Sequence, residues 1–245
     1  MDLTSLDGTE DESFARALCQ KALRPDPGDP QVPSVATVCV YPRLIAECKR
    51  RLAGSEVGVA SVAGGFPSGQ ASLLVKLDEV QAAIDLGADE IDLVIDYRAF
   101  LAGEVGRISE EVSRVKERIG TVPLKVILET GQLGAPATVR RASEQALAAG
   151  ADYLKTSTGK TRPGATPEAT LVMLEAIREH HASTGRKVGI KAAGGVRSAR
   201  QALDYRALVE QTLGEDWLSP ALFRLGASAL LDDVVAELRL LAYRE

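Results

Sequence analysis

Histidine, cysteine and aromatic residues are scarce in this sequence, and each scarcity narrows what the protein can be. Two histidines and three cysteines occur among 245 residues, and aromatic residues make up 4%. His180 and His181 are neighbours whose side chains would point about 100° apart on a helix, so we interpret them as an exposed helix end. Cys19, Cys39 and Cys48 are odd in number and lack metal-ligand spacing, which predicts free thiols in a cytoplasmic protein. We therefore expect no metal and no cofactor.

Long apolar runs and an excess of positive charge are missing too. No stretch of about 18 apolar residues predicts a transmembrane helix, and the acidic segment 1–7 does not have the pattern of a signal peptide. The net charge is −5, without a basic run. That balance argues against nucleic acid or an anionic membrane as a partner. A small phosphorylated ligand remains open, because it needs only a few local donors.

What is present is a regular alternation of β-rich and helical patterns. Helical periodicity is clear at 73–84, 108–119, 139–146 and 171–177. Thr166-Pro167 predicts a helix start, with a hydroxyl cap and proline in the first turn. Segment 24–33, with four prolines, reads as a local loop. Apolar runs predict eight strands, at 1–6, 35–41, 57–62, 90–95, 123–129, 152–157, 188–192 and 222–227.

The connections and the length favour a closed barrel. Gly87 and Gly150 each end a helical pattern a few residues before a strand, the short connection of a repeating α/β unit. A chain of 245 residues is close to the typical size of a (β/α)8 barrel, about 250. The alternative, a doubly wound sheet, would usually show a glycine-rich fingerprint after its first strand. Here the glycine turns follow late strands, so we predict a single-domain (β/α)8 TIM barrel over residues 1–245.

Charged residues interrupt several predicted strands near the ends where a barrel carries its active site. They are Asp92, Lys125, Glu129, Lys155 and Lys191, joined by Asp2 and Thr4 if the first strand is real. One strand lysine is more often a structural residue whose charge is paired or reaches water. Several such charges from different strands need one another, or a ligand, as partners.

Lys155 is the most informative of them. A buried amine is costly unless it is paired, neutral or used in chemistry. Lys191 near Lys155 would disfavour its protonation, and burial acts in the same direction. A neutral amine can attack a carbonyl and form a Schiff base. Asp92 could keep Lys191 charged and move protons through a water. We therefore predict catalytic roles for Lys155, Lys191 and Asp92.

The glycine turns predict a phosphate site. Backbone N–H groups there would be joined by the Ser228 hydroxyl and by cationic help from Lys160 and Arg197. The alternative is that these glycines only form tight loops. Cys39 reads as a thiol of the core or pocket wall rather than a nucleophile. The expected binding residues at the turns are Thr158, Gly159, Lys160, Gly194, Gly195, Val196, Arg197, Gly226 and Ser228.

At these residues the sequence resembles the deoxyribose-phosphate aldolases, which are class I (Schiff-base) enzymes. The resemblance runs from residue 1 to about residue 231. Its most specific segment is Leu-Lys-Thr-Ser-Thr-Gly at 154–159, supported by 38–42, 87–92, 124–130, 194–197 and 224–228. It implies a Schiff-base role for Lys155, a perturbing role for Lys191 and a proton relay through Asp92. It also places Asp2 in the pocket, and we expect Thr4, Cys39 and Lys125 to join it there.

The implied reaction is reversible cleavage of 2-deoxy-D-ribose 5-phosphate to D-glyceraldehyde 3-phosphate and acetaldehyde, in deoxyribonucleotide catabolism. The sequence departs from the family pattern at Asp96, at Ala192-Ala193 after Lys191 and at Ala229 after Ser228. We expect no helix before the first strand, where the family usually has one, and we do not expect Tyr243 to reach the pocket. Alternatives are another Schiff-base sugar-phosphate aldolase, a transaldolase-like enzyme, or a non-catalytic sugar-phosphate-binding protein. We expect a homo-oligomer, with a dimer as the default.

Overall fold

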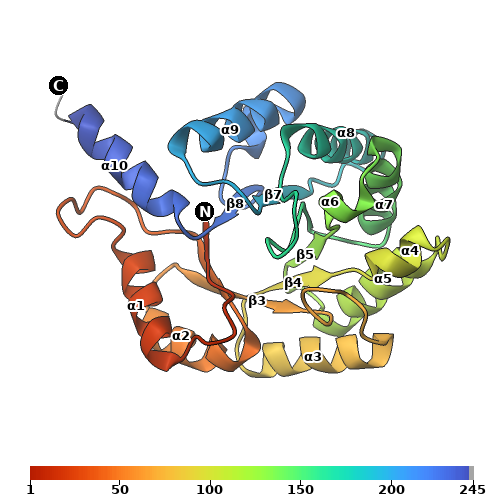
Figure 1. Cartoon of the computed structure of the whole chain (residues 1–245), viewed down its shortest axis with the longest axis horizontal. Coiled ribbons are helices and arrows are strands. Elements are labelled where there is room, and N and C mark those ends of the chain that lie inside the picture. The colour runs from red at the N-terminus through yellow and green to blue at the C-terminus, as the bar shows by residue number, and fades with distance from the viewer. Residues whose placement is uncertain (243–245) are drawn as a thin grey trace.

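Eight parallel strands close into a barrel in the computed structural model, which describes residues 1–242 (Figure 1). Neighbouring strands in sequence pair with each other, and β1 closes the ring by pairing with β8. The predicted TIM barrel is confirmed, including its short first strand. Most strands are shorter than expected. The prediction that Tyr243 does not reach the pocket concerns a residue outside the described range. The strands are β1 Asp2–Thr4, β2 Thr37–Val40, β3 Gly58–Ala63, β4 Glu90–Val94, β5 Leu124–Ile127, β6 Tyr153–Lys155, β7 Gly189–Ala193 and β8 Phe223–Ala227.

Helices surround the barrel, and the four that periodicity predicted are α3, α5, α7 and α8. Thr166 caps α8 as expected, since its Oγ1 accepts a hydrogen bond of 3.2 Å from the Ala169 N–H. Gly87 and Gly150 have φ of 98° and 102°, the left-handed conformation that the predicted connections need. The helices are α1 Glu12–Leu23, α2 Ile45–Leu52, α3 Leu73–Asp85, α4 Tyr97–Leu101, α5 Arg107–Ile119, α6 Thr130–Leu133, α7 Pro136–Ala148, α8 Pro167–Thr184, α9 Ala199–Leu213 and α10 Leu230–Ala242, with short 3-10 turns η1 Pro42–Leu44 and η2 Glu215–Trp217.

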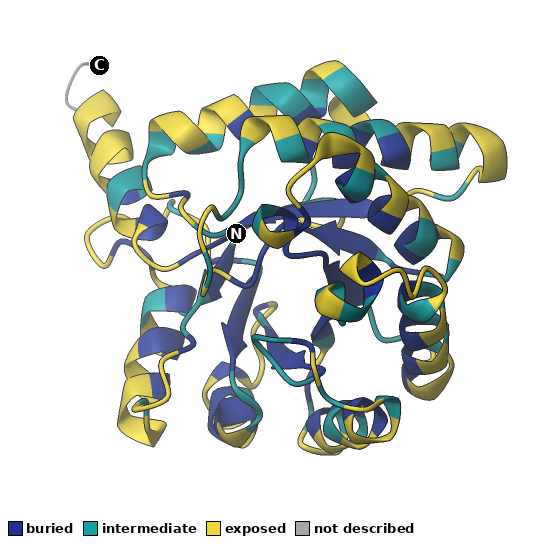
Figure 2. Cartoon of the chain, turned by 45° about the vertical axis from the view of Figure 1, so that its right-hand side comes forward, coloured by how far each residue is buried: buried dark blue, intermediate teal, exposed yellow. Residues whose placement is uncertain are grey.

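Alternate residues of each strand face opposite sides of the barrel wall, because the side-chain period of a strand is two. Outward residues such as Val126, Leu154 and Ile190 pack against the helices in the main hydrophobic core. The strands are buried while the helices alternate between buried and exposed stripes (Figure 2). The inward residues are different in kind, because they include most of the buried charges of the molecule.

Strand register brings those inward charges together. Lys155 of β6 is the direct partner of Lys191 of β7, and Asp92 of β4 is the partner of Lys125 of β5. Lys191 is in turn the partner of Arg224 in β8. Paired residues point to the same face of a sheet, so all five side chains enter the barrel.

Some expectations differ from the structure. Gly226, counted among the turn glycines although it falls within the predicted strand 222–227, lies within β8. Glu129, expected in a strand, lies beyond β5 with φ of 54°, where it precedes α6. His180 and His181 are half-buried rather than exposed, because the His181 ring packs edge-on against Trp217 at 5.1 Å between centroids. None of the helices described here combines the length and the apolar character needed to cross a membrane.

Candidate active site

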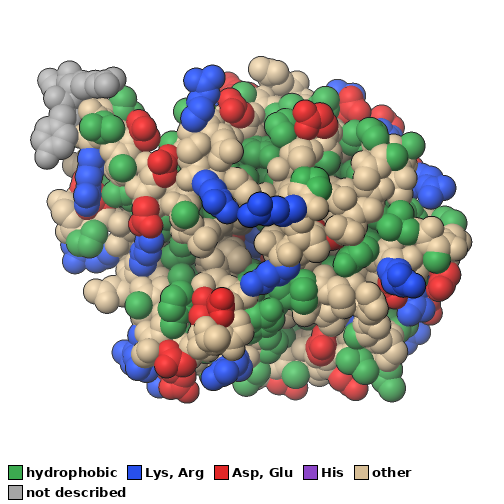
Figure 3. Space-filling model, viewed as in Figure 1, with side chains coloured by type: hydrophobic (Ala, Val, Ile, Leu, Met, Phe, Trp, Pro, Cys, Tyr) green, Lys and Arg blue, Asp and Glu red, His purple; other side chains and the backbone are tan. Residues whose placement is uncertain are grey.

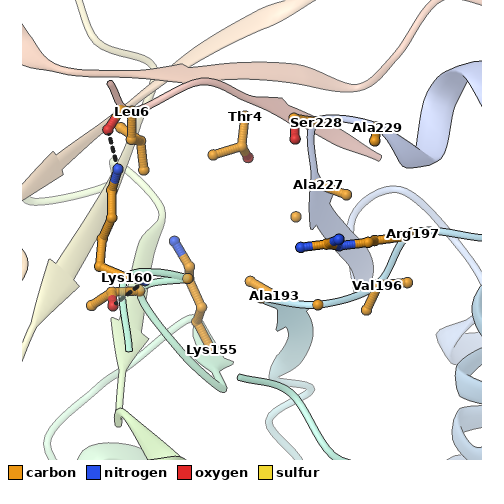
Figure 4. A pocket seen from close by; sticks show the side chains of 15 residues that line it. Thr4, Leu6, Lys155, Lys160, Ala193, Val196, Arg197, Ala227, Ser228 and Ala229 are labelled. Carbon is orange, nitrogen blue, oxygen red and sulfur yellow. Dashed lines mark hydrogen bonds between the residues drawn. The ribbon is translucent and has the colours of Figure 1, made fainter. Parts of the chain in front are cut away.

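A cavity of about 310 Å³ opens at the carboxyl ends of the strands. It lies near the centre of the face in Figure 3, where Lys and Arg side chains gather around a hollow. Figure 4 shows the residues that line it. Eleven of them were predicted as site residues: Thr4, Lys155, Thr158, Gly159, Lys160, Gly194, Gly195, Val196, Arg197, Gly226 and Ser228. Leu6, Ala193, Ala227 and Ala229 complete the lining and were not predicted.

One wall of the cavity is backbone, formed where the loops after β6 and β7 meet. Gly159 and Gly194 have φ of 79° and 89°. A Cβ on Gly194 would lie 3.2 Å from the Cα atoms of both Gly159 and Gly164. The Ala165 N–H crosses to the Gly194 carbonyl with a hydrogen bond of 2.8 Å. The glycines therefore let two loops approach closely and leave main-chain groups facing the cavity.

Cationic and hydroxyl groups line the cavity on both sides of Lys155, with Lys160 on one side and Arg197 and Ser228 on the other (Figure 4). The Lys160 ammonium donates to the Leu6 carbonyl across the mouth, and the Arg197 guanidinium extends toward the cavity centre (Figure 4). Ser228 is exposed and precedes α10, close to Thr4 of the neighbouring strand β1. Main-chain N–H groups with two cations and a hydroxyl form a suitable setting for a phosphate dianion.

Lys155 ends β6 and reaches the cavity from below, with 1% of its surface exposed. Its Nζ lies 2.6 Å from Asp92 Oδ2. Lys191 is fully buried under the cavity, with Nζ 2.7 Å from the same Asp92 oxygen and 2.6 Å from Asp2 Oδ2. The expected proximity of the two lysines is confirmed, and one carboxylate oxygen joins them.

The two lysines have opposite electrostatic environments. Burial lowers the pKa of Lys155; the charge of Lys191 acts in the same direction, while Asp92 opposes both. Lys191 is also buried, but Asp2 and Asp92 together overcome that penalty and raise its pKa well above the usual value. Burial opposes ionisation of Asp92, yet Lys125, Lys155 and Lys191 hold its pKa well below the usual range. The arrangement favours one neutral amine at the cavity and one ammonium beneath it.

Three residues that were expected to bind substrate lie below the cavity and do not line it. Asp2 and Lys125 are buried in the ion-pair network, with Lys125 Nζ 2.9 Å from Asp92 Oδ1. The Cys39 thiol lies 3.7 Å from Asp92 Oδ2, and burial raises its pKa, so it stays protonated. Inward residues this deep are covered by Lys155 and its neighbours, which places them in a supporting layer.

Sequence reasoning missed two members of that layer, Glu90 and Arg224. Arg224 Nη1 lies 2.6 Å from Asp2 Oδ1, and Arg224 Nη2 lies 3.0 Å from Glu90 Oε1. Glu90 also pairs with Lys125. The sequence contained a signal for Glu90, because it stands two residues before Asp92 in the same strand and therefore faces the barrel interior as Asp92 does.

Glu129 has a structural role that its strand-like sequence context did not predict. Its carboxylate accepts a hydrogen bond of 2.5 Å from the Thr158 hydroxyl, and it faces the Thr158 N–H at 3.3 Å. Thr158 Oγ1 in turn accepts from the Lys160 N–H at 3.1 Å. Glu129 thus fixes the loop that carries Thr158, Gly159 and Lys160 into the cavity wall. Within residues 1–242, no three His, Cys, Asp or Glu side chains are grouped to hold a metal ion.

Comparison with known proteins agrees with this geometry. Relatives from Mus musculus and Homo sapiens, each named deoxyribose-phosphate aldolase, are 43% and 42% identical over 244 residues, covering 96% of this chain and 77% of each relative. The deoxyribose phosphate aldolase of Aeropyrum pernix, whose structure is described as a unique tetramer, matches with a TM-score of 0.73 at 26% identity, covering 98% of this chain and 89% of that one. A family model described as DeoC/LacD family aldolase matches residues 1–232. Because that match extends over nearly the whole barrel, the chain belongs to the DeoC/LacD family of aldolases.

Proposed function

We propose that this protein is a Schiff-base aldolase that cleaves 2-deoxy-D-ribose 5-phosphate reversibly to D-glyceraldehyde 3-phosphate and acetaldehyde. The observation that carries the proposal is the position of Lys155 at the cavity floor, where its amine and the buried Lys191 ammonium contact the same carboxylate oxygen of Asp92. The substrate is taken from the names of the mouse and human relatives. A role in deoxyribonucleotide breakdown follows from that substrate.

Lys155 begins the reaction as the nucleophile. Its neutral amine attacks the aldehyde carbon of the open-chain sugar phosphate, and loss of water leaves a protonated imine. The imine is an electron sink, so removal of the C3 hydroxyl proton allows the C2–C3 bond to break. The electron pair of that bond moves into the imine to form an enamine, and the C3 carbon leaves as the aldehyde of D-glyceraldehyde 3-phosphate.

Asp92 and Lys191 provide for the proton transfers. The proposed base is a water hydrogen-bonded to the Asp92 carboxylate, whose Oδ2 also pairs directly with the Lys191 ammonium at 2.7 Å. The same water returns a proton to C2 of the enamine. Hydrolysis of the resulting imine frees acetaldehyde and restores the Lys155 amine.

The phosphate anchors the substrate at the other end of the cavity. Gly159, Gly194 and Gly195 offer main-chain groups in the cavity wall, with Arg197 and Ser228 on one side of Lys155 and Lys160 on the other (Figure 4). Interaction with this remote group positions C1 over Lys155, so that binding energy contributes to the chemical step. Ala229 follows Ser228 and has no hydroxyl, which removes one hydrogen bond that a serine would add, about 0.5–1.5 kcal/mol.

Trapping the covalent intermediate tests the proposal. The protein is incubated with acetaldehyde and borohydride, digested and analysed by mass spectrometry. One ethyl group should be found on Lys155, and Lys155→Met should remain unlabelled and fail to cleave 2-deoxy-D-ribose 5-phosphate. Labelling at another lysine, or none in the wild type, would refute the proposal.

The same assay separates the alternatives. A transaldolase-like enzyme would react with a ketose donor rather than with acetaldehyde, and a binding protein would bind the sugar phosphate without turnover. Activity should survive treatment with a chelator, because the scheme uses side chains and water and no step in it requires a metal ion. Loss of activity with chelator that added metal restores would contradict this scheme.

A further inference from the structure

A continuous chain of ion pairs crosses the barrel interior from the cavity to the opposite mouth. It starts at Lys155, passes through Asp92 and Lys191, and reaches Asp2. From Asp2 it continues to Arg224 and then to Glu90, the first residue of β4. The Glu90 side chain is 12% exposed, so the chain of ion pairs ends at the amino-terminal mouth of the barrel.

The charges in this network do not balance if all of them ionise. Four cations, Lys125, Lys155, Lys191 and Arg224, face three carboxylates, Asp2, Glu90 and Asp92. A net positive charge in a buried site is energetically unfavourable. Loss of the proton from one lysine removes that charge with the smallest free-energy cost.

The carboxylate partners of each cation show which lysine loses its proton. Lys125 has carboxylate oxygens of Glu90 and Asp92 as close partners, and Lys191 has those of Asp2 and Asp92. Arginine is effectively always charged in proteins. Lys155 has a single carboxylate oxygen, which it shares with Lys191. The excess charge therefore falls on Lys155.

On this basis, and resting on the proposed function, we propose that Arg224 and Glu90 are positioning residues that set how readily Lys155 gives up its proton. Neither lines the cavity. Arg224 supplies the cation that leaves the network one positive charge in excess. Glu90 limits that excess by neutralising Arg224 and Lys125 from the far end.

Few other ionisable groups face this network. Cys39 of β2 and Tyr153 of β6 point into the barrel, and burial raises the pKa of each, so both stay neutral. β3 contributes the apolar Ala60 and Val62. The amino group of Met1 lies near Asp2 and Arg224, and burial lowers its pKa. Arg224 lowers and Glu90 raises the pKa of that amino group as well, so its response makes both expected shifts smaller without changing their direction.

Two substitutions with opposite expected effects test the proposal. The rate of acetaldehyde trapping on Lys155 by cyanoborohydride is measured against pH in the full-length protein. Arg224→Gln removes a cation, so its profile should move to higher pH by about one unit, a tenfold loss of neutral amine on the acidic side. Glu90→Gln removes an anion, so its profile should move to lower pH by a similar amount.

Two controls separate charge from damage to the fold. Arg224→Lys keeps the cation and should keep the wild-type profile. The double variant Arg224→Gln/Glu90→Gln lacks one cation and one carboxylate, so the network again has one positive charge in excess. Its profile should return toward that of the wild type. Far-ultraviolet circular dichroism checks folding, and if Arg224→Gln does not fold, Glu90→Gln and Arg224→Lys still decide the question.

The outcomes distinguish this inference from the proposed function. If wild-type Lys155 is not labelled at any pH, the proposed function fails. If the wild type is labelled but the profiles of both folded single variants stay in place, or move in the same direction, the role of Arg224 and Glu90 is overturned. Opposite shifts that cancel in the double variant support it, because a merely structural disturbance would not cancel.

Discussion

Replacing Lys191 with methionine should raise the pKa of Lys155 and suppress Schiff-base formation at neutral pH. The two Nζ atoms lie 2.6 and 2.7 Å from the same Asp92 oxygen, so they are at most about 5.3 Å apart. At that distance, two like charges repel by about 3 kcal/mol in an effective dielectric of about 20. That energy corresponds to about two pKa units.

A second effect of Lys191→Met has the same sign. Asp92 would lose one of its lysine partners and hold the proton of Lys155 more strongly. Lys155 therefore becomes neutral only at higher pH, and the neutral fraction at pH 7 should fall by about a hundredfold. Asp2 keeps Arg224 as a partner and Asp92 keeps Lys125, so no carboxylate is left without a cation.

The assay is the rate of borohydride trapping with acetaldehyde, measured between about pH 5 and 10 because the shift is a matter of pH units. Its midpoint should move about two units to higher pH in Lys191→Met, and trapping should recover at alkaline pH. Lys191→Arg keeps the charge and serves as the matched control. A folded Lys191→Met protein with the wild-type profile would refute the electrostatic reasoning. Loss of trapping at every pH would assign Lys191 a role other than depressing the pKa of Lys155.

Three further changes test other parts of the structure. Gly226→Ala would put its Cβ 2.9 Å from Lys191 Cε, so urea unfolding should show a loss of about 1–3 kcal/mol, and unchanged stability would contradict this packing. Glu129→Gln weakens the hydrogen bonds to Thr158, so KM for the sugar phosphate should rise more than kcat falls, whereas a change in kcat alone would contradict this role. Hydrogen bonds from Arg239 hold the pKa of Asp26 at about 2. Because this pKa lies below that of Asp26 in the unfolded chain, the ion pair stabilises the fold above about pH 4, and the stabilisation is lost as the pH falls toward 2. The urea midpoint of Asp26→Asn should therefore fall less than that of the wild type over this pH range. An equal acid dependence in both proteins would contradict it.

Most of the cavity lining could be predicted because it depends on local sequence. Gly159, Gly194 and Gly195 are turn formers after strands, and the segments that carry them, together with Lys160, Arg197 and Ser228, come together once eight parallel strands close. The strands were predictable from apolar runs, and α3, α5, α7 and α8 from periodicity. Helices α9 and α10 went unpredicted, although Ser198 and Gln201 form a capping box at the start of α9 that the sequence already contains. The left-handed conformation of Glu129 also went unpredicted, because local preference disfavours it in a residue other than glycine.

The layer beneath the cavity was less predictable. Asp2 and Lys125 were expected to contact substrate, but they lie under Lys155 because their positions in β1 and β5 are deeper in the barrel. Glu90 stands on the same inward face as Asp92, but nothing in the sequence indicates that it pairs with Arg224. Their pairing joins segments more than 130 residues apart, and no local pattern encodes that distance.

The sequence alone determined which residues could do chemistry: a strand lysine, a second lysine and an aspartate, each surrounded by apolar neighbours that would bury them. Only the tertiary structure decided how close the two lysines lie and which carboxylates surround each of them. The register of β6 against β7 places Lys155 beside Lys191, and the barrel leaves the first at the cavity and the second between two carboxylates. Protonation depends on the sum of charges within a few ångströms in a medium of low dielectric. That sum is a property of the closed barrel rather than of any segment of the chain.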